Sequence, residues 1–205
     1  MPKVGMAEIR KPQLIAATMD AIEAVGLSRA NVQLISRNAG VTPAIINHYF
    51  GGKDGLLEAT MRDVLRQLGL AVRRELAACH PDDTVGRLKA IVGGNFATEQ
   101  VNKRVVKTWL AFWALSMHEP VLHRLQHVNE QRLLSHLRRE LKRILPREQA
   151  AFVAQGIAAL IDGIWLRGAL SPQGIDVAFA KRLISDYLQR QLPEKVWQQH
   201  LHYSS

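Results

Sequence analysis

The amino-acid sequence predicts an all-helical protein with a small N-terminal head and a larger C-terminal body. Apolar residues recur with helical spacing along nearly the whole chain of 205 residues, and no alternating pattern typical of strands persists. Glycines and prolines divide this pattern into segments of helical length, so we expect about nine helices. We place a three-helix head at 1–55, a helical body at 56–192 and a tail at 193–205.

The head is expected to contain one long and two short helices. A helix over about 8–25 ends at Gly26, and short helices follow at about 31–39 and 43–49. Lys53 and Asp54 open a longer helix that runs towards Ala78. The apolar face of the first helix consists of Leu14, Ile15, Met19 and Ile22.

The body is divided by Pro81, Pro120, Pro146 and the turn at 171–174. The expected helices lie at about 83–98, 101–118, 121–144, 148–170 and 175–191. The third of these is basic and amphipathic, with a stripe of Leu133, Leu137, Leu141 and Leu145.

The helix at 148–170 is apolar on most of its circumference and must be covered on more than one side. We therefore predict that it forms a dimer interface with the helix at 175–191, and we place Ile161 and Ile164 in that interface. The alternative is the central helix of a monomeric bundle.

Composition excludes several classes of protein. The single cysteine, Cys79, rules out an intramolecular disulfide and is typical of the reducing cytosol, so we expect a cytoplasmic location. The first five residues lead directly into mixed charge and lack the apolar core of a signal peptide. Asp162 and Arg167 interrupt the most apolar run, so no membrane span is expected.

The net charge of +9 is compatible with a polyanionic partner, but its distribution does not locate a nucleic-acid site. Residues 1–55 carry six basic and four acidic groups, a net charge of +2, and the remaining +7 lies in 56–205. A solvated basic surface explains the charge equally well.

The segment 31–50 has the residue pattern of a helix-turn-helix. Its first helix buries Leu34, Ile35 and Ala39. Gly40 supplies the positive φ of a tight turn, and Val41 fills the corner. An ordinary helical corner is the alternative, since the same turn also occurs in proteins that do not bind DNA.

The second helix of this segment has the residues of a DNA-reading element. Thr42 suits the N-cap and Pro43 the first helical position, and the small Ala44 allows close approach to base edges. Asn47 and His48 can hydrogen-bond to a base or a phosphate. Lys53 can pair with a phosphate beside the free N–H groups that begin the next helix.

These residues resemble the TetR family of transcription regulators over 8–60. The matching positions are Gly26, Ile35, Ala39-Gly40-Val41-Thr42, Tyr49-Phe50, Lys53 and Leu56-Leu57. The resemblance implies a homodimeric repressor that binds double-stranded operator DNA, with 43–48 in the major groove and Tyr49 and Lys53 on phosphates. The full set of expected DNA contacts is Thr42, Pro43, Ala44, Asn47, His48, Tyr49 and Lys53.

A further resemblance, to the choline-responsive repressors of that family, extends from residue 1 to about 192. It is carried by segments 1–6, 53–61, 91–96, 107–113, 116–118 and 159–167. It implies control of the genes that convert choline to glycine betaine for osmoprotection, with choline as inducer and with no cofactor. A different small cationic or apolar inducer is the alternative.

Choline presents a trimethylammonium group that carries full charge but no N–H, so aromatic faces and a nearby carboxylate are the groups suited to hold it. Trp109 and Trp113 share a helix face, with Phe112 adjacent, and Asp162 and Trp165 share a face of the apolar helix. Asn95 and Phe96 end another helix. The expected ligand contacts are Asn95, Phe96, Trp109, Trp113, Asp162 and Trp165. The alternative for the aromatic residues is core packing, and the alternatives for Asp162 are pairing with a buried base or a hydrogen bond across a dimer interface.

Other chemistries find little support in the sequence. His118, His123 and His127 are better explained as solvated or core histidines than as a metal site, and Gly93-Gly94 indicates close helix packing. No catalytic motif is present, and we expect no catalytic or metal-binding residue. A helical carrier of small cations and a helical enzyme acting on a quaternary amine are the competing hypotheses.

Overall fold

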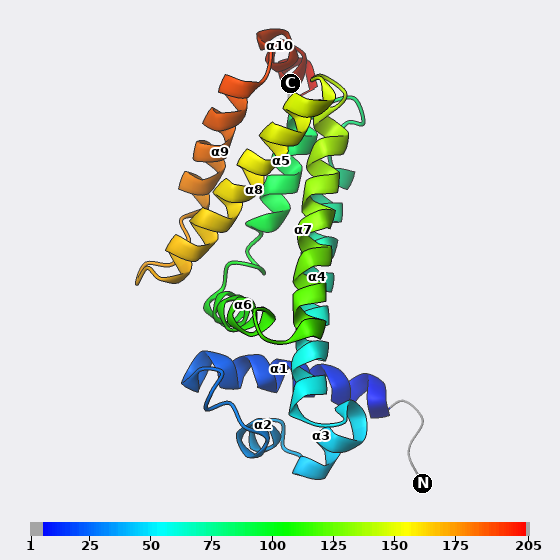
Figure 1. Cartoon of the computed structure of the whole chain (residues 1–205), viewed down its shortest axis with the longest axis vertical. Coiled ribbons are helices and arrows are strands. Elements are labelled where there is room, and N and C mark those ends of the chain that lie inside the picture. The colour runs from blue at the N-terminus through cyan, green and yellow to red at the C-terminus, as the bar shows by residue number, and fades with distance from the viewer. Residues whose placement is uncertain (1–5, 204–205) are drawn as a thin grey trace. The chain divides into compact units, whose positions relative to one another are not determined.

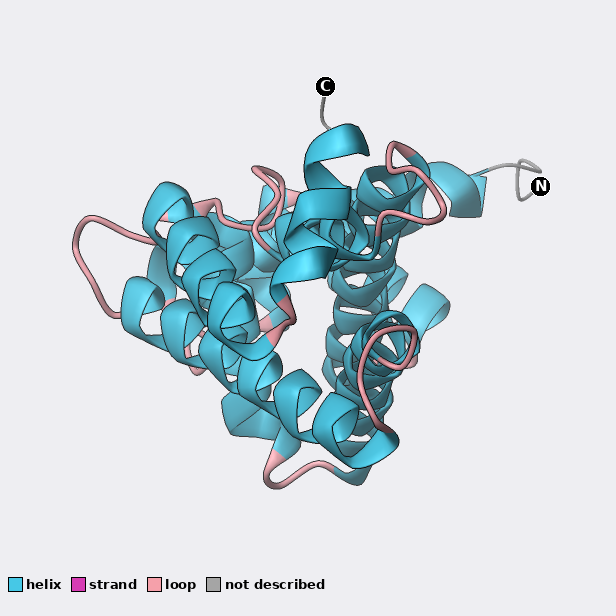
Figure 2. Ribbon diagram, turned by 90° about the horizontal axis from the view of Figure 1, so that it is seen from above, coloured by secondary structure: helices cyan, strands magenta, loops and turns pink. Residues whose placement is uncertain are grey.

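The structure, a computed structural model, describes residues 6–203, and every regular element among them is a helix (Figures 1 and 2). The helices are α1 (Met6–Val25), α2 (Val32–Asn38), α3 (Pro43–Phe50), α4 (Lys53–Ala77), α5 (Thr84–Asn95), α6 (Lys103–Ser116), α7 (Pro120–Leu141), α8 (Arg147–Ala169), α9 (Val177–Gln191) and α10 (Glu194–Tyr203). The predicted all-helical class is confirmed. Residues 1–5, on which the expectation about a signal peptide rested, lie outside the described residues.

The tail contains a helix, α10, that the sequence did not predict. Leu192 leaves the helical conformation at the end of α9, with φ −104° and ψ 145°, and Pro193 accepts the first hydrogen bond of the new helix from the Val196 N–H, at 3.0 Å. Val196 is buried against the body, and α10 packs on α5. The C-terminal segment is therefore part of the body's structure.

The described residues form two compact units, 6–66 with 102–126 and 67–101 with 127–203. This division differs from a boundary at residue 55, because α6 belongs with the head helices. Arg104 forms an ion pair with Asp20 of α1 at 3.1 Å, and Lys107 donates to the Glu23 carbonyl at 2.6 Å. We call the first the head unit and the second the body unit.

The head unit is built on one apolar core shared by α1, α2, α3 and the start of α4. Its fully buried side chains are Leu14, Ala21, Ala30, Ile35, Ile46 and Leu56. Gly26 ends α1 with φ +77°, and Gly40 turns the chain between α2 and α3 with φ +63°. Both glycines were predicted from their positions after apolar helical runs.

The body unit pairs α8 with α9 and packs α9 and α10 on α5. The inner face of α8 buries Val153, Ile157, Ile161 and Trp165. Ile161 is only 3 % exposed, so its placement at a dimer interface is wrong: it is a core residue of its own chain. The large apolar side chains that α8 leaves exposed are Phe152, Leu166 and, at its C-cap, Leu170.

The expectation about membrane spans also needs correction for α8. Its 23 residues are long and apolar enough to cross a bilayer by length and composition, in spite of Asp162 and Arg167. Its buried inner face is also typical of a core helix of a soluble protein.

A glycine contact fixes the spacing of α4 and α5 in the body unit. A Cβ atom at Gly94 would lie 2.5 Å from the Val72 Cα, closer than any side chain tolerates. Close helix packing at Gly93-Gly94, predicted from the sequence, is thus confirmed for Gly94.

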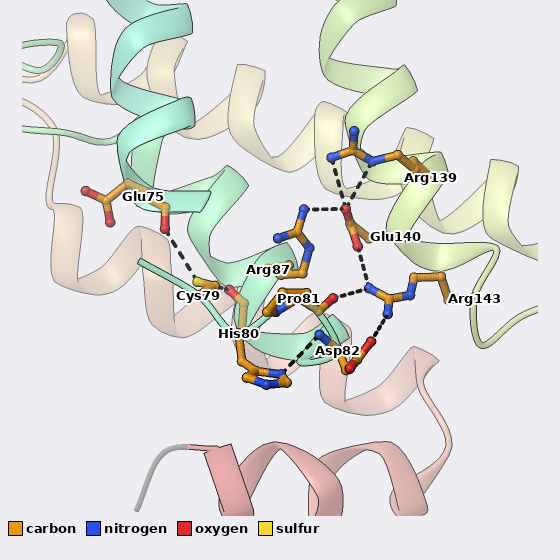
Figure 3. A network of polar contacts seen from close by, with 10 residues as sticks. Glu75, Cys79, His80, Pro81, Asp82, Arg87, Arg139, Glu140 and Arg143 are labelled. Carbon is orange, nitrogen blue, oxygen red and sulfur yellow. Dashed lines mark hydrogen bonds and ion pairs between the residues drawn. The ribbon is translucent and has the colours of Figure 1, made fainter. Parts of the chain in front are cut away.

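A buried carboxylate ties the α4–α5 connection and α5 to α7 (Figure 3). Glu140 is 2 % exposed and accepts hydrogen bonds from Arg87, Arg139 and Arg143 at 3.0 to 3.2 Å. Arg143 also donates to the Pro81 carbonyl at 2.6 Å and to Asp82 at 3.0 Å. Burial opposes ionisation of Glu140, but the hydrogen bonds and charge of Arg87, with those of the other arginines, lower its pKa. The cluster therefore holds an ionised carboxylate inside the body unit.

Candidate DNA-binding head and ligand-binding groups

The turn before α3 positions the predicted DNA-reading helix. Thr42 is its N-cap, in extended conformation with φ −82° and ψ 153°, and Pro43 follows in the first turn. The Thr42 side chain makes no capping hydrogen bond, so its exposed hydroxyl is available to another partner. Asn31 caps α2 instead, accepting from the Leu34 N–H at 2.9 Å.

Helix α3 has one buried and one exposed face. Ile46 is fully buried in the head core, whereas Ala44, Asn47 and His48 are exposed together with Thr42 and Pro43. Tyr49 is half-buried, and its ring meets the His48 ring edge-on at a centroid distance of 4.8 Å. The exposed set matches the residues assigned to DNA from the sequence; contact with DNA itself stays a prediction.

The turn between α3 and α4 depends on glycines that the sequence analysis did not assign. Gly51 and Gly52 have φ of +73° and +128°, values that disfavour any residue with a side chain. A Cβ at Gly55 would lie 1.9 Å from the Phe50 carbonyl oxygen. Because the glycines make this turn short, α4 begins directly after it with Lys53, which is half-buried. The Gly-Gly pair directly after α3 is the signal in the sequence that could have identified this turn.

In the head unit, α6 brings two of the predicted ligand residues together. The Trp109 and Trp113 ring centroids are 6.0 Å apart and the ring planes are tilted by 50°. Phe112 meets the Trp109 ring edge-on at 6.3 Å. Trp109 is buried, whereas Trp113 is half-buried and its indole N–H has no hydrogen-bond partner.

In the body unit, α5 and α8 bring together a second group. The Trp165 indole N–H donates to the Asn95 carbonyl at 3.2 Å, and the Asn95 amide donates to the Ile91 carbonyl at 2.8 Å. Phe96 is 2 % exposed. Asp162 lies more than one-third exposed on α8, and the packed protein around it, with the charge of Glu130, raises its pKa.

The six predicted ligand residues thus form two local groups, one in each unit. Trp109 and Trp113 belong to the head unit; Asn95, Phe96, Asp162 and Trp165 belong to the body unit. Within the part of the chain that the structure describes, no three His, Cys, Asp or Glu side chains gather as a metal site would require.

Comparison with known proteins places both parts of the chain. Residues 14–60 match the model "Bacterial regulatory proteins, tetR family", and residues 85–193 match "BetI-type transcriptional repressor, C-terminal". The HTH-type transcriptional regulator BetI of Vibrio parahaemolyticus is 60 % identical over 94 % of this chain and 96 % of its own length. BetI 2 of Chromohalobacter salexigens is 54 % identical over 94 % and 93 %. Helix α10 begins after the matched C-terminal region.

Solved structures share the fold. A putative transcriptional regulator from Pseudomonas aeruginosa superposes with a TM-score of 0.78 at 25 % identity, covering 96 % of this chain and 94 % of its own. A putative transcriptional regulator from Saccharomonospora viridis, solved in complex with choline, gives a TM-score of 0.74 at 21 % identity, covering 90 % and 98 %. The chain belongs to the TetR family: it is a transcription regulator, not an enzyme, with the C-terminal domain of a BetI-type repressor.

Proposed function

We propose that this repressor acts in the cytoplasm as a homodimer on an operator of the choline-to-glycine betaine genes, and that choline releases it or weakens its binding. The 60 % identity to a BetI regulator over nearly the whole of both chains supports the pathway. The choline complex of the Saccharomonospora viridis regulator supports a choline site in this fold.

In the DNA complex, exposed Ala44, Asn47 and His48 of α3 read base edges in the major groove. Thr42 and Pro43, at the start of α3, allow this end of the helix to approach the DNA backbone. Tyr49 and Lys53 hold phosphates and fix the register of the helix without selecting a sequence.

The dimer is proposed to form through the outer faces of α8 and α9. Phe152 is 72 % exposed, and Leu166, Leu170 and Phe179 are each at least 45 % exposed. Apolar side chains repeated along one helix face favour association, because burial removes their surface from water. Ile164, half-buried on α8, stays a candidate for this interface, whereas Ile161 is excluded.

Choline recognition rests above all on the paired indoles of α6. A cation within about 6 Å of an aromatic centroid is attracted by the ring. The Trp109 and Trp113 centroids are 6.0 Å apart, so one trimethylammonium group can lie within that range of both. The group around Trp165, with Phe96, the Asp162 carboxylate and the Asn95 amide oxygen, is the second proposed contact set.

Induction is then a shift of population. Choline binds more tightly to a conformation of the dimer that fits the operator less well, and it lowers the fraction of repressor able to hold both half-sites. By reciprocity, operator DNA lowers the affinity for choline by the same factor.

Calorimetry of choline binding to tryptophan variants tests this proposal. Trp113→Leu should lower choline affinity by about 1–2 kcal/mol, since leucine is apolar but lacks the ring quadrupole. Trp113→Phe should lie between leucine and wild type. Trp113 is the sharpest reporter because it is half-buried and makes no indole hydrogen bond, so its loss disturbs the fold least.

Trp197→Leu is the matched control, because Trp197 in α10 is also half-buried with an unpaired indole N–H. It should change the melting temperature but leave choline affinity unaltered. Equal losses of choline affinity in the two variants, or losses that follow melting temperature across Trp109, Trp113 and Trp165, would show that these tryptophans serve packing only.

A further inference from the structure

A pocket of about 510 Å³ opens between α4, α5 and α9 in the body unit. This volume is within the range of small-molecule sites. Its walls are mainly apolar and include Ala90, Val92, Ile184 and Leu188. None of the six residues proposed for choline lines it.

Small residues on α5 keep the pocket open. Gly86, Ala90 and Gly93 recur at helical spacing along the wall, and a Cβ at Gly93 would approach the Glu75 carboxylate at 3.4 Å. The start of α5 is fixed by Asp83, its N-cap, which accepts a hydrogen bond from the Gly86 N–H at 2.8 Å and contacts the His200 ring of α10 at 2.9 Å. The pocket is therefore framed by secondary structure that is held by polar contacts.

The charges around the pocket are mostly positive. Lys89, Lys181 and Arg182 line it against the single carboxylate of Glu75. The Glu75 carboxylate also has a cationic neighbour outside the pocket lining: the Arg74 guanidinium lies 3.7 Å from it. Lys89 is held in place by α10, with its Nζ 3.1 Å from the His200 Nε2 and 5.0 Å from the Trp197 ring centroid. Burial disfavours the charged form of Lys89 and lowers its pKa, and a bound anion would favour the charged form again.

We propose that this pocket binds a small amphipathic anion, a carboxylate on an apolar chain or ring, at a site separate from choline. The apolar walls take the chain, and Lys89, Lys181 and Arg182 hold the carboxylate. A cation such as choline is repelled by the same three groups. The repressor thus has two ligand sites of opposite charge preference.

The chain offers a built-in reporter, because its only cysteine, Cys79, lines the pocket. The Cys79 thiol donates to the Glu75 carbonyl at an S–O distance of 3.4 Å (Figure 3). Burial, with the charge of Asp83, raises the pKa of this thiol, so alkylation is best followed at mildly alkaline pH. An occupied pocket should slow the reaction.

The experiment compares three probes of equal chain length on the full repressor. Octanoate should slow alkylation of Cys79 by iodoacetamide, octanol should do so less, and octyltrimethylammonium and choline should not. Calorimetry should show octanoate binding to the Cys79→Ser variant as well. Equal protection by octanoate and octyltrimethylammonium would contradict the charge preference, and absence of both protection and binding heat would contradict the site.

A charge-matched pair of variants completes the test. Lys181→Glu, at an exposed lining position, should weaken octanoate about tenfold or more. Lys142→Glu, at an exposed position on the loop after α7 and outside the lining, alters net charge identically and should have little effect. Equal weakening in the two variants would mean that octanoate responds to overall charge, and the pocket assignment would be overturned.

Discussion

The head and body units are both helical, yet they relate to sequence in different ways. In the head, single residues determine local geometry: Gly40 makes the turn, and Pro43 begins α3. In the body, the functional geometry depends on which helices pack together. For example, the Trp165 indole of α8 donates a hydrogen bond to the carbonyl of Asn95 in α5, 70 residues earlier in the chain. Local chemistry can be predicted residue by residue, whereas a ligand site formed by separate helices requires the tertiary structure.

The largest expected effect comes from a substitution that prevents the proposed dimer from forming. Leu166→Glu places an unpaired charge in the outer face of α8, and a single head can hold only one half-site. Operator affinity should fall about a thousandfold or more, towards the level of random DNA. Sedimentation and operator titration measure the two effects on the same sample.

Leu70→Glu provides the control, since Leu70 is an exposed leucine of α4 outside the proposed interface. It should remain dimeric. Ile161→Glu should unfold the protein instead of yielding a folded monomer, because Ile161 is buried within its own chain. A monomeric Leu166→Glu variant with wild-type operator affinity would refute the dimer proposal.

The next effect concerns the buried charge cluster of the body. Glu140→Gln removes the charge that pairs with Arg87, whose side chain is 16 % exposed, and should lower the free energy of unfolding by about 3 kcal/mol. Thermal and urea denaturation measure it. A loss no larger than that of Glu58→Gln, in an exposed i,i+4 pair with Arg62, would show that the cluster contributes little.

The same cluster predicts a dependence on pH. The Glu140 pKa is lower in the folded protein than in the unfolded chain, so its stabilisation is complete above the usual glutamate pKa. It is lost as pH falls through the lower folded value. Wild type should therefore lose stability in acid more steeply than Glu140→Gln, as urea denaturation at several pH values would show; parallel curves would contradict the cause given for the shift.

A smaller effect separates the roles of residues in the head. Lys53→Ala and Tyr49→Phe should weaken operator and random DNA alike, and Lys53→Ala should reduce the magnitude of the salt slope by about one unit. Asn47→Ala should cost about 1–3 kcal/mol on operator alone. Asn47 is a cleaner probe than His48, whose ring contacts Tyr49. If Asn47→Ala and Lys53→Ala each lose the same affinity for operator as for random DNA, the assignment of Asn47 to bases and Lys53 to phosphates is wrong.

The sequence predicted the nine main helices to within a few residues, because their ends are marked by Gly26, Gly40 and the prolines. It missed α10, whose formation depends on packing Val196 against the body. It also placed Ile161 at an interface, because an apolar position on an apolar helix does not reveal which side faces its own core. The burial of Ile161 resolves this point.

The candidate sites show the same limit. The exposed residues of α3 follow from the turn chemistry, and their exposure agrees with the predicted pattern. The tryptophan pair on α6 follows from i,i+4 spacing alone. The pocket between α4, α5 and α9 does not follow from any motif, since its lining comes from segments about one hundred residues apart.

The central claim is that choline binds at the indole pair of α6 and thereby lowers the affinity of the repressor for its operator, without changing the DNA-contacting residues of α3. Its most direct test is a titration of fluorescent operator DNA with wild type and Trp113→Leu, with and without choline. Both proteins should bind operator equally well without choline, and the variant should need about five- to thirtyfold more choline for release. If Trp113→Leu loses operator binding and choline response together, or if choline never weakens wild-type binding, the account is contradicted.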